Sequence, residues 1–467
     1  MQGMGYGLWA RLACRVATTL VFLTAGLCAT ARAQSTPAPA PLASAEASTT
    51  RQPTPGQLMN DAGVFLRGHY TNESAWNPSG GLRQNQDYAD QIDLGVDLDM
   101  QKLAGVDGAA IHVTLSNRTG RDLSIDALGN NVLTQEIYGG GQTLKLSELT
   151  WDQALFHDKF EIYAGRESSG FYGFSPINCN FQTNAFCGHL DSFFRDVGLA
   201  SFPVSTWGAR LQIKPNKRFY ISTGAFEVNP FVSRHVDNDF TWNAVGATGY
   251  VIPIEFGYGT AFANDAYPRH YKFGAYYDSS AVADPLFDKN GHFISATGGT
   301  PAQHSGRTGI YSFLDQVVYR PDRKTNRNLA LITGFTHSLD SPEPIAWGAM
   351  GGLLYTGPFR GRDLDTIGFI TTVMTIGQRR LEYLTQERAK AGGHGSPASG
   401  EYVLELNYGV QLNSWLRVMP NFQYVMNPDN FAHPKQRFET PDAFVVGLKV
   451  LVDFVRLAGL HPGVYSH

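Results

Sequence analysis

The stretch D-Q-I-D-L-G-V-D-L-D-M at residues 90–100 alternates apolar and acidic side chains over most of its length. Because successive side chains of a β-strand point to opposite faces, this pattern places one chemical type on each face. The two sets are Ile92, Leu94, Val96, Leu98 and Met100 on one face, and Asp93, Asp97 and Asp99 on the other. A strand of this kind suits a wall between lipid and water.

The same alternation recurs along most of the chain and predicts about sixteen strands. No apolar run in the body is long enough for a transmembrane helix. We therefore expect an all-β fold, a closed antiparallel transmembrane β-barrel in the outer membrane. The expected strands are 61–70, 90–100, 109–117, 144–154, 160–166, 207–213, 218–226, 254–260, 270–277, 310–319, 328–336, 346–354, 365–374, 402–412, 415–425 and 443–454. The residues expected to face lipid include Leu94, Val96, Leu98, Phe444, Val446 and Leu448.

The connections between these strands alternate between short and long. Short turns include His157-Asp158-Lys159, Pro215-Asn216-Lys217 and Asn413-Ser414, whereas 167–206, 227–253, 278–309 and 375–401 are long. Outer-membrane barrels have short periplasmic turns and long outer loops, and an even number of strands brings both ends to the periplasm. The connection 337–345 is short where a long one is expected.

Residues 1–33 have the features of a Sec-type signal peptide, and so indicate export. Arg11 and Arg15 precede an apolar core, and Ala31-Arg32-Ala33 fits a cleavage site before Gln34. A lipoprotein anchored through Cys28 is the alternative, and Leu27 fits that motif poorly because a small residue is wanted there.

The rest of the chain divides into three parts. Residues 34–57, rich in Pro, Ala and Ser, form an expected flexible linker. Residues 58–454 form the expected barrel domain, and 455–467 form a C-terminal tail. The net charge of −4 does not point to nucleic acid as a partner.

Only Cys179 and Cys187 remain once the signal peptide is removed. In an oxidising compartment this close pair is expected to form a local disulfide. A zinc site needs about four ligands, and this segment adds only His189 to the pair, so we expect no metal.

Several segments, in order along the chain, resemble the carbohydrate-selective porin family of OprB type. They are N-P-S-G-G (77–81), L-D-M-Q-K-L-A-G-V-D-G-A (98–109), L-S-E-L-T-W-D-Q-A-L-F-H-D-K-F-E-I-Y-A-G-R (146–166), C-N-F-Q-T-N-A-F-C-G (179–188), W-G-A-R-L-Q-I-K-P (207–215), L-Y-T-G-P-F-R-G-R-D-L-D (354–365), E-L-N-Y-G-V-Q-L-N-S-W-L (405–416) and P-N-F-Q-Y-V-M-N-P (420–428). The resemblance implies passive, substrate-selective diffusion of mono- or small oligosaccharides into the periplasm, without a cofactor. The expected partners are small carbohydrates, outer-membrane lipid and lipopolysaccharide, and the protein is expected to be a monomer or a homotrimer.

Sugar passage needs a narrow, wet constriction, where arginine forks bind hydroxyl groups and aromatic rings stack on sugar faces. These residue types gather around the third outer loop, residues 167–206, which therefore holds the first candidates for lining the pore. In the alternative interpretation, these aromatics pack the loop on itself and the charges face solvent. The second outer loop offers a weaker pair of arginines. The candidates are Arg166, Glu167, Phe171, Tyr172, Phe174 and Arg195 around the third outer loop, and Arg118 and Arg121 at the second outer loop.

The carboxylates on the strands could also be interpreted as paired catalytic acids, as in glycosidases. They include Asp93, Asp97, Asp99, Glu148 and Asp152, and their alternation favours a lumen-facing role instead. No common nucleophile, zinc-protease or phosphate-loop motif is present, so we do not expect an enzyme. The alternatives that remain are a general or anion-selective porin, an outer-membrane enzyme barrel, and a periplasmic sugar-active protein.

Overall fold

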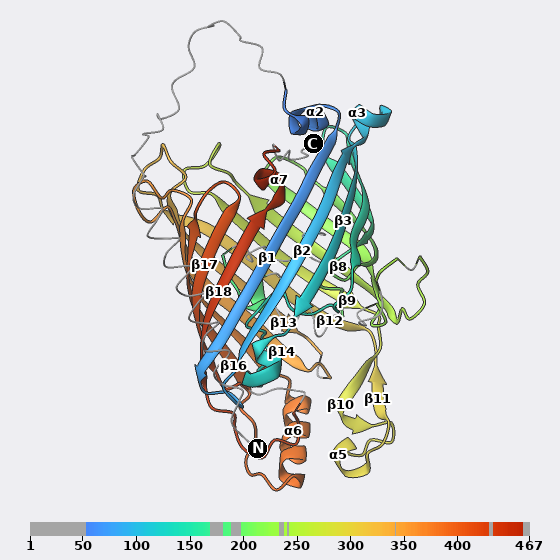
Figure 1. The fold of residues 1–467 in the computed structure, drawn as a ribbon. Helices are drawn as coiled ribbons and strands as arrows, with labels where there is room; N and C mark the ends of the chain where they lie inside the picture. The colour runs from blue at the N-terminus through green and yellow to red at the C-terminus, as the bar shows by residue number, and fades with distance from the viewer. Residues whose placement is uncertain are drawn as a thin grey trace, which may run out of the picture. The chain divides into compact units, whose positions relative to one another are not determined.

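The computed structural model describes residues 53–168, 181–187, 198–232, 238–240, 242–340, 342–428 and 433–460. Sixteen strands close into one antiparallel barrel in which neighbours in sequence are neighbours in space (Figure 1). The predicted fold class and strand number are therefore confirmed. Residues 1–52, expected to hold the signal peptide and most of the linker, lie outside the described part.

The barrel strands are β1 (Val64–Ser79), β2 (Gln86–Asp99), β3 (Ala109–Gly120), β4 (Lys145–Leu155), β5 (Phe160–Glu167), β6 (Thr206–Ile213), β7 (Phe219–Val228), β8 (Gly249–Gly259), β9 (Arg269–Asp278), β12 (Arg307–Tyr319), β13 (Asn328–Ser338), β14 (Ile345–Thr356), β15 (Thr366–Ile376), β16 (Gly400–Gln411), β17 (Leu416–Met426) and β18 (Ala443–Asp453). A separate hairpin consists of β10 (Val282–Asp288) and β11 (Pro301–His304). The helices are α2 (Pro55–Asp61), α3 (Met100–Ala104), α5 (Ile294–Thr297), α6 (Gln378–Lys390) and α7 (Phe454–Leu457), with a π-helical turn at Ser124–Leu128 and a 3-10 turn at Ala185–Cys187.

The two ends of the barrel differ as the sequence predicts. Helices α2, α3 and α7 lie at one end, whereas α6 and the β10–β11 hairpin lie at the other (Figure 1). The first end carries the short turns, and the second carries the long connections. By the rule for outer-membrane barrels, the first end is periplasmic and the second is extracellular. No helix among the described residues is long and apolar enough to cross a membrane.

One connection is shorter than the sequence suggested. The expected strands 61–70 and 90–100 leave a connection of residues 71–89 that contains N-P-S-G-G, but β1 continues through Ser79 and leaves only residues 80–85 before β2. The buried side chain of Asn77 explains this, because its amide donates to the carbonyls of Gly80 and Arg83 and its oxygen accepts from the Asn85 N–H. A tight turn therefore replaces the expected loop.

The side chains of β2 face the directions that their alternation predicts. Leu94 is 53% exposed on the outer surface, whereas Asp97 is 8% exposed and points inward. On β18, Leu448 is exposed and Lys449 is buried, and Phe444 stacks on Phe422 of β17 on the outer face. The predicted lipid-facing register is therefore confirmed on both strands.

Asp90 departs from this pattern, because it shares the outward register of Ile92 and Leu94. Its carboxylate accepts hydrogen bonds from the hydroxyl groups of Tyr70, Tyr88 and Thr119 on the same face. These hydroxyl groups satisfy a carboxylate that would otherwise be costly beside lipid.

The barrel closes between the first and last strands. β1 pairs with β2 on one side and with β18 on the other, where Glu73 lies opposite Lys449. The last strand was expected to reach Phe454 and ends one residue earlier, because the Asp453 side chain accepts the Arg456 N–H and starts α7.

Candidate functional site

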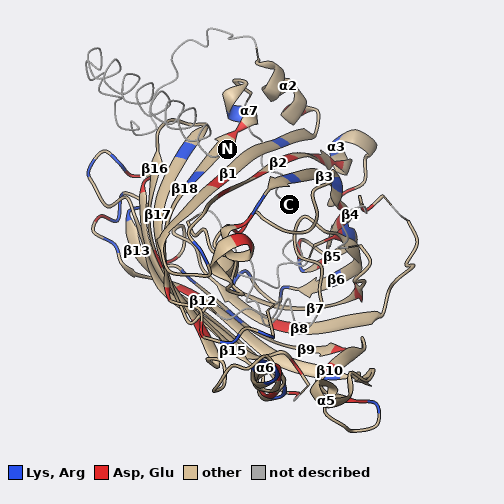
Figure 2. Cartoon of the chain, turned by 60° about the horizontal axis from the view of Figure 1, so that its bottom comes forward, with Lys and Arg blue, Asp and Glu red and all other residues tan. Residues whose placement is uncertain are grey.

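Two outer connections fold into the barrel and fill part of its interior (Figure 2). We call residues 121–144, between β3 and β4, L2, and residues 168–205, between β5 and β6, L3. Of L3, residues 168, 181–187 and 198–205 are described. Leu123, Leu128 and Phe186 from these loops are fully buried and pack with inner-face residues of the barrel wall, including Val445 of β18.

L2 is bound to the wall through a carboxylate on β16. Glu401, 3% exposed, accepts the backbone N–H groups of Asn131 at 2.7 Å and Val132 at 2.9 Å. It also accepts the side-chain amide of Asn131 at 3.2 Å. One wall carboxylate thus satisfies two consecutive peptide donors of the loop.

L3 is bound in the same way, four residues further along the same strand. Glu405, fully buried, accepts the backbone N–H groups of Thr183 at 2.9 Å and Asn184 at 3.0 Å. The side-chain amide of Asn184 donates to it at 2.8 Å. Because residues two apart on a strand share a face, Glu401 and Glu405 both point into the barrel.

Two further wall residues contact both loops. The Gln423 amide donates to the Thr134 carbonyl of L2 at 2.9 Å and to the Thr183 hydroxyl of L3 at 3.0 Å. The Lys449 ammonium lies 2.8 Å from Glu136 of L2 and 3.0 Å from Glu73 of β1. It also donates to the Gln182 carbonyl of L3 at 3.4 Å.

A cation, a carboxylate and a ring meet beside these contacts. Arg118 lies on the inward register of β3, donates through Nε to Gln91 at 2.7 Å, and places its guanidinium 5.5 Å from the ring of Phe202 in L3. Burial acts against the Arg118 charge, and the carboxylate of Glu136 is the main group that opposes this effect. These three side chains bring a guanidinium, a carboxylate and an aromatic ring to the level of the inward-folded loops. The Arg118 guanidinium is buried and also donates to the Tyr138 and Gly139 carbonyls of L2 at 3.4 and 3.5 Å.

Comparison with known proteins identifies the family. The model of the carbohydrate-selective porin, OprB family, matches residues 83–454. The chain belongs to this family. Porin B of Pseudomonas aeruginosa is 27% identical over 408 residues, covering 84% of this chain and 88% of the relative. The putative porin QuiX of Acinetobacter baylyi is 25% identical over 430 residues, covering 85% of this chain and 91% of the relative.

A solved structure supports the same conclusion. The high-pH structure of Pseudomonas putida OprB superimposes with a TM-score of 0.78 at 29% identity, covering 85% of this chain and 96% of that one. This OprB-family porin is a passive carbohydrate channel of the outer membrane and not an enzyme.

The structure brings only some of the predicted site residues of this OprB-family porin to the lumen. Arg118 lies there, as described, and Glu167 is buried on the inward register of β5, close to Glu148 and Arg210. Phe171, Tyr172, Phe174 and Arg195 lie outside the described residues.

Arg121 and Arg166 lie away from this site. Arg121 is exposed at the rim of the barrel and pairs with Asp126. Arg166 has the register of β5 opposite to that of lumen-facing Tyr163, and its guanidinium stacks on Trp207 at 5.5 Å. Trp207 shares the outward register of exposed Leu211 on β6. Arg166 is on that register too, but it is fully buried and donates to the Ser205 carbonyl of L3 at 2.9 Å.

Cys187 is disulfide-bonded and ends the short 3-10 turn that follows the Glu405 contacts. Its predicted partner Cys179 lies outside the described residues, so the pairing stays a prediction.

The strand carboxylates belong to an ionic network of the porin wall. Arg67 lies 2.7 Å from Asp97 and 3.0 Å from Glu148, and His112 lies 2.9 Å from Asp97. Asp97 and Glu148 are thus bound to cationic or imidazole partners on the inner wall, whereas Asp93 accepts from the Gln91 amide and Asp99 caps α3. The described residues contain no group of His, Cys, Asp and Glu suited to a metal ion.

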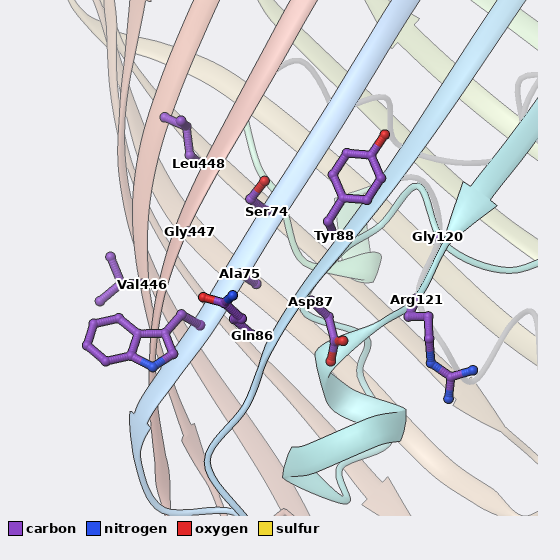
Figure 3. A pocket seen from close by; sticks show the side chains of 11 residues that line it. Ser74, Ala75, Gln86, Asp87, Tyr88, Gly120, Arg121, Val446, Gly447 and Leu448 are labelled. Atoms are coloured by element: carbon purple, nitrogen blue, oxygen red, sulfur yellow. The ribbon is translucent and has the colours of Figure 1, made fainter. Parts of the chain in front are cut away.

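A groove of about 590 Å³ lies on the wall and is distinct from the channel (Figure 3). Its lining includes Trp76, Tyr88 and Leu448, which occupy outward registers of β1, β2 and β18. Ser74 lies between them and leaves the space open. The groove therefore opens mainly to the lipid-facing side of the porin.

Sequence reasoning missed the residues that hold the loops. Glu401, Glu405, Gln423 and Lys449 are visible as polar residues on the inward register of the last strands. Their partners lie far away in sequence, because Thr183 and Glu405 are 222 positions apart, so no local pattern joins them.

Proposed function

We propose that neutral mono- and small oligosaccharides are selected at a constriction formed by Arg118, Glu136 and Phe202. The guanidinium supplies donors in a fixed fork, the carboxylate accepts from hydroxyl groups, and the ring offers a face for stacking. The observation that carries the proposal is the 5.5 Å approach of Arg118 to Phe202, which joins a barrel strand to L3.

The test is a liposome swelling assay with glucose, a neutral amino acid and a small anion. The Arg118→Ala variant should lose preference for glucose over the amino acid, because the donors to hydroxyl groups are removed. Arg121→Ala is the matched control, since Arg121 is exposed at the rim and pairs with Asp126. An unchanged preference in Arg118→Ala would contradict the proposed site. Equal permeation of all three solutes by the native protein would favour a general diffusion porin instead.

We infer that the signal peptide is removed before insertion, so that the mature protein begins at Gln34. The motif Ala31-Arg32-Ala33 supports this inference. N-terminal sequencing of protein from the outer-membrane fraction tests it, and a start elsewhere would contradict it.

We propose that outer-membrane lipid and lipopolysaccharide contact the apolar outer face. Exposed Leu94, Phe422 and Leu448 support this proposal.

The protein is a monomer or a homotrimer, and its mass in detergent separates these states. If the mass is that of a trimer, we expect a second copy to cover the outward polar cluster around Asp90, because polar groups pack better against protein than against lipid. Asp90→Leu should then release monomers.

A further inference from the structure

We infer that Glu401, Glu405, Gln423 and Lys449 are positioning residues that hold L2 and L3 as one body and so set the size of solute that passes. This inference rests on the proposed constriction, because it concerns how that constriction is kept in place. None of the four residues needs to touch the sugar.

The first support is that the two loops are bound by the same device. Each loop presents two consecutive peptide N–H groups to a single buried glutamate of β16, together with two asparagine amides from L2 and one from L3. Hydrogen bonds to a buried carboxylate are stronger than neutral ones, and leaving peptide donors unsatisfied in a buried site is costly. Each glutamate therefore fixes the backbone of its loop at one point of the wall.

The second support is that the two attachments are linked. Gln423 and Lys449 each contact both L2 and L3, from β17 and β18 respectively. Lys449 also reaches Glu73, across the seam where β18 meets β1. A shift of one loop therefore disturbs groups that bind the other.

The third support is that the attachments lie on neighbouring strands. The four residues lie on β16, β17 and β18, which are paired in that order, and Lys449 reaches Glu73 on β1, which pairs with β18. The loops are thus attached to one continuous sector of the wall, and the free width depends on how tightly they are held there. Weakening the attachments should widen the channel.

The experiment compares Glu401→Ala, Glu405→Ala and the double variant in liposome swelling with small and large neutral solutes. One pair of solutes is glucose and sucrose, and the other is two polyethylene glycols of different length. Each single variant should raise the ratio of large-solute to small-solute rates several-fold in both pairs. The double variant should exceed the single variants only slightly, because loops linked by Gln423 and Lys449 move together. Independent loops would instead give multiplied effects and would overturn the one-body part of the inference.

Glu255→Gln is the matched control for Glu405→Gln. Glu255 is a buried inward-facing glutamate of β8, but it accepts the hydroxyl groups of Tyr220 at 2.7 Å and Tyr311 at 3.1 Å. Glu405→Gln keeps the shape and one acceptor oxygen, so it should fold where an alanine variant does not. It should raise the size ratio while the control leaves it unchanged.

Thermal unfolding of each variant in detergent separates positioning from general damage. A melting temperature near that of the native protein together with a raised size ratio supports the inference. Size ratios equal to the native value in every folded variant would overturn it. A failure of the proposed sugar site would be detected independently, because the test of that site compares solutes of similar size and does not depend on the width of the channel.

Discussion

Neighbouring residues of one strand meet opposite environments in this protein. Val96 lies on the outward register of β2 among apolar side chains, whereas Asp97 binds Arg67 and His112 inside the barrel. Tolerance to a new charge should therefore change from one position to the next.

Val96→Arg should lower the free energy of unfolding by about 2–4 kcal/mol, because it places a cation on the lipid face. His69→Arg is the control. His69 is exposed on the inward register of β1, so the charge of the introduced arginine stays in water. Equilibrium unfolding by urea in lipid vesicles measures both. Equal losses in the two variants would show that the assigned register is reversed.

Strands and loops differ in how far the sequence specifies them. The strand 90–100 and the terminal strand ending near Phe454 could be predicted with their registers, because alternation is a local pattern that burial on one side enforces. The inward fold of L2 and L3 could not, because it depends on contacts such as Glu405 with Thr183 that the chain sequence separates widely. Arg166 shows the same limit, since its outward register follows from its pairing with Trp207.

The disulfide of L3 gives a prediction at the level of the loop. Cys179→Ser with Cys187→Ser should leave the melting temperature nearly unchanged but alter the relative permeation of sugars. The predicted pairing of Cys187 with Cys179 closes a short loop, and the chain entropy that a disulfide removes grows with loop length. The affected segment lies directly beside the contacts of Glu405. Free thiols in the purified native protein, or native sugar rates in the double variant, would contradict this prediction.

Glu343 lies in the short connection between β13 and β14, and it should make the stability of the protein depend on pH. Burial raises the pKa of Glu343 to about 7, against the opposing effect of Arg307, which lies 3.2 Å away. At a pH below 4.5, the ordinary pKa of a glutamate, the carboxyl is protonated in both the folded and the unfolded protein. As pH rises from there to 7, the unfolded chain releases its proton first, so the folded protein loses stability, by up to about 3 kcal/mol.

Thermal unfolding at pH 5 and pH 8 measures this loss. Glu343→Gln removes the titrating group, so its melting temperature should fall less between the two pH values than that of the native protein. The same fall in both proteins would assign the pH dependence to other groups.

The two ends of the barrel differ and define its orientation in the membrane, because the long connections gather at one end. The hairpin β10–β11 lies at that end, whereas the turn between β6 and β7 lies at the other. A cysteine placed at exposed Asn290, in the hairpin, should react with a membrane-impermeant maleimide on intact cells. A cysteine at exposed Lys217, in the opposite turn, should react only after the outer membrane is opened. The reverse result would invert the orientation.

The pairing of β1 with β18 has a consequence for biogenesis. Glu73 and Lys449 meet only when the first and last strands are joined. L2 and L3 bind β16, which belongs to the C-terminal part of the chain that is synthesised last. Contacts between such distant parts of a chain form late, because closing long loops costs entropy. The barrel therefore cannot close until its final strand is available. Before that pairing the strands would form an open sheet without a closed lumen, so the narrow channel is the last part of the protein to form.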